Sequence, residues 1–292
     1  MSIALRRAAE IPPGERHALE MAMENFYRHP PAPYYPIADQ VGSHYDPQLH
    51  PFHCDLVSRV QPGMRVLELG CGTAHLCPSI EKRGAIYTGL DHSSALLSEN
   101  RRKFPRAHFA SIETQARESF DLVASLYTIE HVVNPRAYLE RMWQYCKPDG
   151  LLAVICPEFI DNECLPPSLF YGKTARRFKE KLRSLDLQDV FAHVVDLKKR
   201  APAWKSEAVR TPPGAFWINL RPRMLHGAPY SIDADAIHLP RLKDLIAWFR
   251  ERPTEIVTTS RDLPNVRPEV LRFNCYIVAR KNGPNSPPSS RA

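Results

Sequence analysis

The chain has 292 residues, of which 43% are apolar and 24% charged, and its formal net charge is +7. This composition is typical of a globular protein large enough to bury a sizeable core, and no run approaches the roughly 18 apolar residues that a membrane helix needs. Seven cysteines without paired metal-type spacing, and the lack of an apolar signal core after Arg6 and Arg7, lead us to expect a cytoplasmic protein with no membrane partner.

The basic residues are densest in two short runs. One is Arg176-Arg177 with the lysines that follow it, and the other is Lys198-Lys199-Arg200. Acidic residues stand close to both runs, and no aromatic RNA-binding motif accompanies them, so a solvated helix face is favoured over a nucleic-acid surface. We therefore do not expect nucleic acid to be a partner.

The first 60 residues predict two helices joined by a stiff segment. Residues 14–29 have apolar side chains at helical spacing, and residues 46–60 read as a second helix with Asp46 as its N-cap. Between them lies a proline-rich stretch that contains Tyr34 and Tyr35, followed by Tyr45. These tyrosines either clamp the segment to the body or line a substrate pocket, and we take them as candidate substrate-binding residues.

A glycine turn organises the rest of the chain. Residues 65–69 read as a buried strand that ends at Glu68-Leu69, and Gly70 and Gly72 follow it. A helix is expected from Thr73, with its free N–H groups facing the turn, and the next strand is closed by Asp91. This order is that of a nucleotide-binding strand–helix–strand unit, although an ordinary tight turn is the alternative.

After the turn, the chain alternates strands and helices, which predicts a parallel sheet covered on both faces. The expected strands are 85–90, 107–110, 120–127 and 151–156, and the expected helices are 93–102 and 135–146, with a turn at 147–150.

Residues 64–157 resemble the cofactor-binding core of class I S-adenosylmethionine-dependent methyltransferases, in their small-molecule branch. The resemblance rests on Glu68-Leu69-Gly70-Cys71-Gly72, on Asp91, and on the run from Phe120-Asp121 through Glu130-His131 to Lys147-Pro148-Asp149-Gly150. It implies a Rossmann-like, doubly wound, seven-stranded and mostly parallel sheet. Ala74 replaces a third glycine of the family, and His75 stands where a dinucleotide dehydrogenase would have glycine, which argues against an oxidoreductase.

The resemblance also implies how S-adenosylmethionine would be held. Glu68 would bind its amino-acid end, the backbone of Gly70, Cys71 and Gly72 would approach it closely, and Asp91 would accept hydrogen bonds from the ribose hydroxyls. The remaining positions would contact the adenine or the methionine moiety: His92, Ser111, Ile112, Leu126 and Tyr127. Ile112 and Leu126 could instead be plain core, and His92 a helix cap.

The domain organisation follows from these elements. Residues 1–60 form an N-terminal helical arm and 61–157 the cofactor-binding core. The region 158–239 is far longer than a usual connection and is expected to be a cap inserted after the fifth strand, containing a basic helix at 174–185 and a strand-like stretch at 215–220. Residues 240–281 complete the core with a helix at 242–250 and strands at 255–260 and 271–279, and 282–292 form a disordered tail.

His131 is the candidate catalytic residue. It follows the fourth strand, where the methyl group is expected, and could remove a proton from a hydroxyl acceptor; alternatively it only supports the next helix. His193, His226 and His238 are further histidines that the sequence does not rank. Ubiquinone-pathway and small-RNA methyltransferases carry Glu-x-x-Glu-His here and bind a divalent ion, but this chain lacks the first acid, so no metal is expected.

We therefore expect an enzyme that methylates a small molecule, most simply on oxygen, with S-adenosylmethionine as cofactor and S-adenosylhomocysteine as product. Two alternatives stay open: methylation of RNA or protein, and a methyltransferase-like binding protein without activity. The sequence leaves the acceptor and the oligomeric state open.

Overall fold

The computed structural model describes residues 4–30, 36, 50–113, 119–162, 165–223 and 233–283. Tyr34, Tyr35, Tyr45, His226 and the expected disordered tail beyond residue 283 lie outside the described residues.

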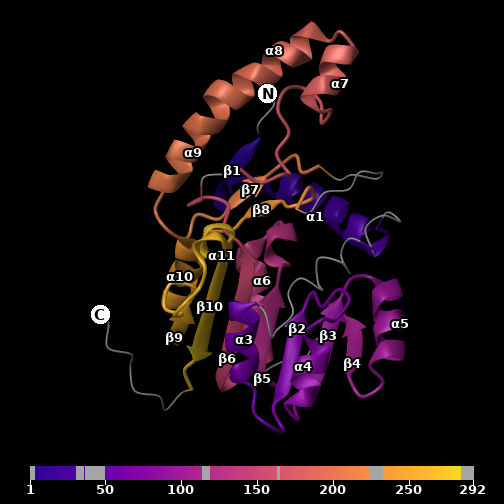
Figure 1. Cartoon of the computed structure of the whole chain (residues 1–292), viewed down its shortest axis with the longest axis vertical. Helices are drawn as coiled ribbons and strands as arrows, with labels where there is room; N and C mark the ends of the chain where they lie inside the picture. Colours follow the sequence, from indigo (N-terminus) through magenta and orange to yellow (C-terminus); the bar gives the residue numbers. More distant parts are fainter. Residues whose placement is uncertain are drawn as a thin grey trace.

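The centre of the molecule is a seven-stranded sheet with the order β4-β3-β2-β5-β6-β10-β9 (Figure 1). All strands are parallel except β10, which is antiparallel to both of its neighbours. The strands are β2 (Arg65–Leu69), β3 (Ile86–Asp91), β4 (His108–Ser111), β5 (Phe120–Leu126), β6 (Cys146–Pro157), β9 (Thr254–Thr259) and β10 (Asn274–Lys281). The predicted α/β, Rossmann-like, mostly parallel fold is confirmed.

Helices cover both faces of this sheet. One apolar cluster joins the sheet to α6 and α10 through side chains such as Leu139 and Trp248, and a second joins it to α3, α4 and α5 through Leu56, Ile80 and Leu97. The helices are α3 (Pro51–Ser58), α4 (Cys77–Lys82), α5 (Ser94–Lys103), α6 (Pro135–Tyr145), α10 (Leu242–Arg250) and α11 (Pro268–Phe273). Because both faces are buried, the strands can be apolar along their whole length.

Local caps explain why two helices start where the sequence predicts. The Ser93 side chain accepts a hydrogen bond from the Leu96 backbone at 3.3 Å, and the Asn134 side chain accepts one from Ala137 at 3.1 Å. Pro135 occupies the first position of α6, where its missing N–H costs nothing.

Several boundaries differ from the sequence-based expectation. The turn expected at 147–150 is part of β6, which begins at Cys146, where it pairs with Phe120 of β5. The helix after the glycine turn begins at Cys77 and not at Thr73, because Ala74 adopts a left-handed conformation with φ of 57°. In the second expected helix, α3 begins at Pro51 with His50 as N-cap, a start that proline at the first position favours, and the expected N-cap Asp46 lies outside the described residues. The last strand begins at Asn274, since the preceding residues form α11.

A second, three-stranded sheet joins the N-terminal segment to the inserted region. Its order is β1-β7-β8, formed by Leu5–Arg7, Trp217–Asn219 and His238–Leu239, and all pairs are antiparallel. The sheet is tied to the loop after β5, since Ile237 donates its N–H to the Glu130 carbonyl at 2.8 Å. Met23 of α1 (Pro13–Arg28) packs in a small cluster with Ile218 and Ile237, which places this helix above the sheet edge.

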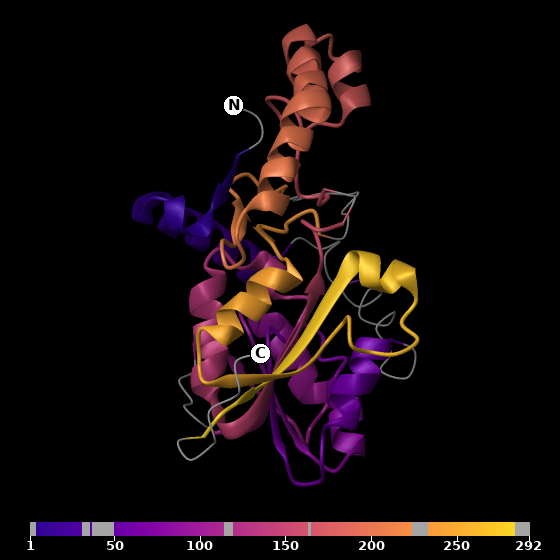
Figure 2. The ribbon, with the colours of Figure 1, turned by 90° about the vertical axis from the view of Figure 1, so that its left-hand side faces the viewer.

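Residues 173–210 of the inserted region form a helical hairpin, here called the projecting hairpin, that extends away from the body (Figures 1 and 2). It consists of α7 (Phe178–Arg183), α8 (Leu187–Val195), a π-helical turn (Asp196–Arg200) and α9 (Ala201–Arg210). The basic helix expected at 174–185 is thus shorter, at α7. No helix in the described ranges combines the length and the apolar character needed to cross a bilayer.

Candidate functional site

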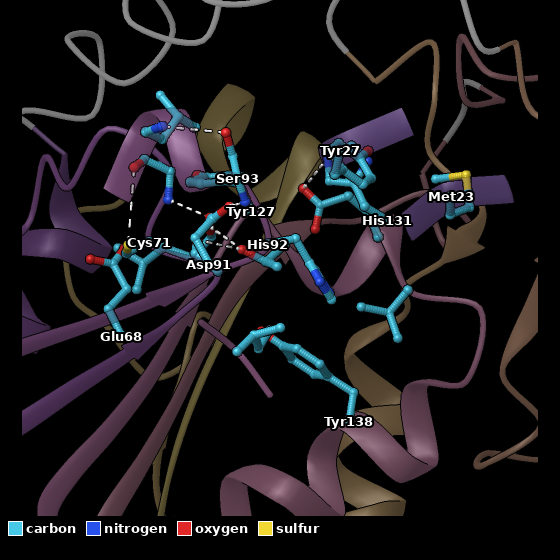
Figure 3. Close-up of a pocket in the computed structure, with 18 of the residues that line it drawn as sticks. Met23, Tyr27, Glu68, Cys71, Asp91, His92, Ser93, Tyr127, His131 and Tyr138 are labelled. Carbon is cyan, nitrogen blue, oxygen red and sulfur yellow. Dashed lines mark hydrogen bonds and ion pairs between the residues drawn. The ribbon is translucent and has the colours of Figure 1, made fainter. Parts of the chain in front are cut away.

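A cavity of about 570 Å³ opens at the carboxyl ends of the parallel strands (Figure 3). It lies where the strand order reverses, between β2 and β5, which is where open α/β sheets bind ligands. Its walls come from the glycine turn, the end of β3, the loop after β5, α1, α6 and the segment before β8.

The glycine turn forms one wall, and its two glycines are required for different reasons. Gly70 has φ of +78°, and a Cβ there would lie 2.2 Å from Thr128 Cγ2, so the turn packs directly on the loop after β5. Gly72 has φ of +50°, but a Cβ there would meet nothing within 4 Å. The backbone at Gly72 therefore borders open space, which fits the close approach of a cofactor.

Asp91 ends β3 beside this turn and lines the cavity. One of its carboxylate oxygens accepts the Gly72 N–H and the other the Ser93 N–H, both at 2.9 Å. The carboxylate thus fixes the turn and the start of α5 at once. Each oxygen keeps a further lone pair, so two hydroxyls of a ribose can still donate to it.

Glu68 also borders the cavity, but its carboxyl group is buried. Burial raises the pKa of Glu68 to about 8, the nearby charge of Asp91 adds to this, and a hydrogen bond from the Tyr87 hydroxyl opposes it. Glu68 is consequently protonated at neutral pH in the ligand-free protein.

The other residues implied for the cofactor fall into two groups. Cys71, His92, Ile112, Leu126 and Tyr127 line the cavity. Ser111 is not among the lining residues, and its hydroxyl accepts the Glu113 N–H at 3.4 Å. Tyr127 has φ of 51°, an uncommon conformation for a bulky residue, and its hydroxyl donates to Asn274 Oδ1 at 3.1 Å.

His131 faces the opposite half of the cavity, between two carboxylates (Figure 3). Its Nδ1 lies 3.6 Å from Asp235 Oδ2, and its Nε2 lies 3.9 Å from Glu130 Oε1. The Tyr27 hydroxyl donates a hydrogen bond to the same oxygen of Asp235, and the Tyr27 and His131 rings meet edge to face with centroids 5.5 Å apart. Helix α1, the loop after β5 and the cap therefore converge on His131.

Two of the carboxyl groups around His131, those of Glu130 and Asp235, are buried, and Asp233 is half-buried. Burial, together with the charge of Asp233, raises the pKa of Glu130 well above its usual range, and burial raises that of Asp233 to about 6. Glu130, His131 and Asp233 each bring one possible ligand atom within 4.8 Å of the others. Asp233 is distant from Glu130 in the sequence but lies near it in the fold, so it could replace the acid that the Glu-x-x-Glu-His motif has and this chain lacks. The expectation of a metal-free site stays a prediction.

Sequence reasoning missed much of this second half. The residues it did not single out include Met23, Tyr27, Thr128, Tyr138, Arg141, Asp233 and Asp235. The pair of acids two positions apart, Asp233 and Asp235, was a signal that could have marked the segment. His238 is fully buried with Nδ1 3.1 Å from the Ile129 carbonyl, and His193 lies in the projecting hairpin, so neither borders the cavity.

Comparison with known proteins gives three results. The family model described as a methyltransferase domain matches residues 45–257. Ubiquinone biosynthesis O-methyltransferases of Bradyrhizobium diazoefficiens and Rhodopseudomonas palustris are 33% and 32% identical over 99 residues, which is 32% of this chain and 39% of each relative. The aligned part thus spans about two fifths of the length of these relatives.

One solved structure has a similar overall fold. It is the 1,6-didemethyltoxoflavin-N1-methyltransferase of Burkholderia thailandensis with bound 1,6-didemethyltoxoflavin and S-adenosylhomocysteine. It superposes with a TM-score of 0.51 and 14% identity, over 96% of this chain and 95% of that one. With the family model covering most of the chain, the protein belongs to the methyltransferase-domain family and has the fold of class I S-adenosylmethionine-dependent methyltransferases.

Proposed function

We propose that the enzyme methylates a small molecule on a hydroxyl oxygen, with the acceptor bound in the half of the cavity around His131. The observation that carries this proposal is that one continuous cavity is bordered by the glycine turn and Asp91 at one side and by His131 at the other. A methyl donor and an acceptor could therefore lie side by side, which supplies most of what an in-line displacement requires from a protein.

The cofactor half fits S-adenosylmethionine, which when bound supplies an electrophilic methyl group on a sulfonium sulfur. The Gly72 backbone borders the space beside the amino-acid end, and Asp91 accepts from the ribose hydroxyls. Leu126 and Tyr127 line the passage toward the acceptor half. Glu68 is proposed to bind the ammonium group, which requires loss of the proton that its burial retains.

In the acceptor half, His131 is proposed to be the general base. The acceptor oxygen forms a bond to the methyl carbon as the carbon–sulfur bond breaks, and the hydroxyl proton moves to a ring nitrogen of His131. Asp235, whose Oδ2 lies 3.6 Å from Nδ1 of His131, would stabilise the resulting imidazolium. The named activity of the ubiquinone O-methyltransferase relatives supports oxygen as the accepting atom.

Charge supports a small acceptor over a nucleic acid. The acidic residues that border the cavity include Glu20, Glu24 and Asp235, besides Glu130 and Asp233, whose raised pKa values reduce their negative charge. A phosphate backbone would be repelled by this wall. The basic residues that raised the alternative of RNA lie on the projecting hairpin.

The test uses the full chain, S-adenosylmethionine labelled in its methyl group, and a cell extract divided into small-molecule and macromolecular fractions. We expect label to enter the small-molecule fraction and S-adenosylhomocysteine to bind in calorimetry. Dopamine, catechol and caffeic acid serve as acceptor probes that share one diphenol group and differ in charge, being cationic, neutral and anionic. Mass spectrometry of any product then distinguishes oxygen from nitrogen as the methylated atom. Label only in RNA or protein, or cofactor binding without any transfer, would contradict the proposal.

A further inference from the structure

The projecting hairpin, residues 173–210, has an apolar surface that the cavity and its chemistry do not explain. Twelve large apolar side chains are exposed among the described residues, and eight of them lie on this hairpin. They are Phe178, Leu182, Leu185, Leu187, Phe191, Val194, Leu197 and Val209. Such a concentration of exposed apolar side chains marks an interaction surface.

The most exposed of these side chains gather at the tip. Leu185, in the turn between α7 and α8, is 79% exposed, and it adopts a left-handed φ of 55°. Leu187 and Phe191 are 72% and 71% exposed, and with Val194 they form a stripe at positions i, i+4 and i+7 of α8. The tip is the part of the hairpin farthest from the sheet in both views (Figures 1 and 2).

The hairpin also carries most of the net charge of the chain. Residues 173–210 contain eleven Lys or Arg and five Asp or Glu, a formal charge of +6 out of +7 for the whole protein. Asp189 and Asp196 are buried, and so is Lys181, which leaves ten basic and three acidic side chains at its surface. The exposed face is therefore both apolar and strongly basic.

The hairpin is held rigid by its own buried polar groups. Lys181 Nζ lies 3.0 Å from Asp189 Oδ1 and also donates to the Thr174 carbonyl at 2.9 Å, and Asp196 accepts the Gly172 N–H at 2.7 Å. These groups face inward, on the side of α8 away from the Leu187–Phe191 stripe. The apolar stripe is thus displayed on a preformed support.

We propose that the projecting hairpin is a docking surface for an anionic membrane surface, with the side chains at its tip entering the boundary between headgroups and acyl chains. The apolar stripe of α8 is flanked by the Lys and Arg of α7 and of the π-helical turn, a combination typical of surfaces that lie at a membrane interface. Each basic residue near an anionic bilayer contributes about 1 kcal/mol. The expectation of no membrane partner rested on the lack of a spanning segment, and the peripheral contact proposed here does not need one.

Other occupants fit these observations less well. A second copy of the chain would bring two hairpins of formal charge +6 together, which costs free energy. A nucleic acid would pair with the lysines and arginines but would leave Leu185, Leu187 and Phe191 in water. A protruding tip offers no groove in which a partner helix could bind, whereas its side chains can enter a lipid layer directly.

The test measures co-sedimentation of the full chain with vesicles of phosphatidylcholine alone and of phosphatidylcholine mixed with phosphatidylglycerol. We expect binding to the anionic vesicles only, and weaker binding at higher salt. The variant Leu187→Glu/Phe191→Glu should lose about tenfold or more in vesicle affinity. The matched control is Leu271→Glu/Phe273→Glu, which changes exposed apolar residues of α11 outside the hairpin and should bind as the unchanged protein does.

A second variant separates charge from insertion. Lys198→Glu/Lys199→Glu should abolish the preference for anionic vesicles, while binding of S-adenosylhomocysteine and the melting temperature stay the same in all variants. Absence of binding to anionic vesicles would overturn the proposal. So would binding that depends on the lysines but not on Leu187 and Phe191, or a dimer in light scattering that the Leu187→Glu/Phe191→Glu variant dissociates. If that variant unfolds, Phe191→Ser replaces it with the same expected loss.

Discussion

The two halves of the cavity are built in different ways. The cofactor half comes from consecutive elements of the sheet, and one short turn with Asp91 fixes most of its geometry. The acceptor half is assembled from segments more than a hundred residues apart, where Tyr27 of α1, His131 and Asp235 meet. The first half is thus set by local chain geometry that the family shares, whereas the second depends on this chain's own tertiary contacts and can differ between relatives.

The largest expected effect comes from the acceptor half, at His131. Replacing it in His131→Ala should lower turnover by about 10²–10⁴-fold if it is the general base, with the affinity for S-adenosylhomocysteine unchanged. The measurement combines single-turnover kinetics with calorimetry. His131→Asn can donate and accept hydrogen bonds but cannot take the proton at neutral pH, so it should be equally slow. Near-normal turnover per folded molecule in either variant would assign His131 a structural role only.

The cofactor half is tested at Asp91. Asp91→Ala should weaken S-adenosylhomocysteine binding by roughly 1.5–3 kcal/mol, which is the range for hydrogen bonds to a charged group and corresponds to about 10- to 150-fold in Kd. Asp149→Ala, in the turn at the start of β6, removes a carboxylate outside the cavity wall and serves as the control for calorimetry. Unchanged affinity in Asp91→Ala would show that the ribose is held elsewhere.

A smaller effect is expected at Tyr27, which distinguishes the two halves most directly. Tyr27→Phe removes the hydrogen bond to Asp235 and should cost about 0.5–1.5 kcal/mol in acceptor binding. We expect this loss of binding free energy to be observed as a higher KM for the acceptor, while the affinity for the cofactor does not change. The matched control is Tyr171→Phe, whose ring packs on His193 of α8 and does not border the cavity. A loss of cofactor affinity in Tyr27→Phe would mean that the halves are not independent.

A further prediction concerns stability and not activity, through its dependence on pH. Because the pKa of Glu68 rises from 4.5 to about 8 on folding, the folded state binds this proton more tightly than the unfolded state does. Its contribution to the unfolding free energy is therefore fully present below about pH 4.5 and is lost as the pH rises toward 8. Glu68→Gln should remove this decline. The unfolding free energy of the variant, measured by chemical denaturation, should therefore increase relative to that of the unchanged protein as the pH rises. A constant difference between the two proteins would exclude a raised pKa.

The cofactor half could be predicted from sequence because its determinants are local. The strand before the turn matches β2 at both ends, and Gly70 and Gly72 both take positive φ. The helix start was missed because Ala74, a residue with a side chain, adopts the left-handed conformation that sequence assigns to glycine. Ile112 borders the cavity while Ser111 does not, a difference of one residue that depends on how β4 ends.

The acceptor half could not be predicted because nothing local brings its parts together. Helical periodicity identified α1, yet the direction in which Tyr27 points follows from the packing of Met23 against the cap. Asp233 and Asp235 lie in a segment without strong periodicity, and the hydrogen bond from Ile237 to the Glu130 carbonyl determines where they are presented. Such long-range contacts leave no trace in the spacing of residues along the chain.

The pairing of β1 with β7 has a consequence for synthesis. Leu5 pairs with Asn219, so β1 has no partner in its sheet until more than two hundred further residues have been synthesised. The strands that form the cofactor half, from β2 to β6, are complete well before that. Since closing so long a loop is slow and domains tend to fold in order of synthesis, a nascent chain would bind S-adenosylhomocysteine before α1 is docked and the acceptor half exists.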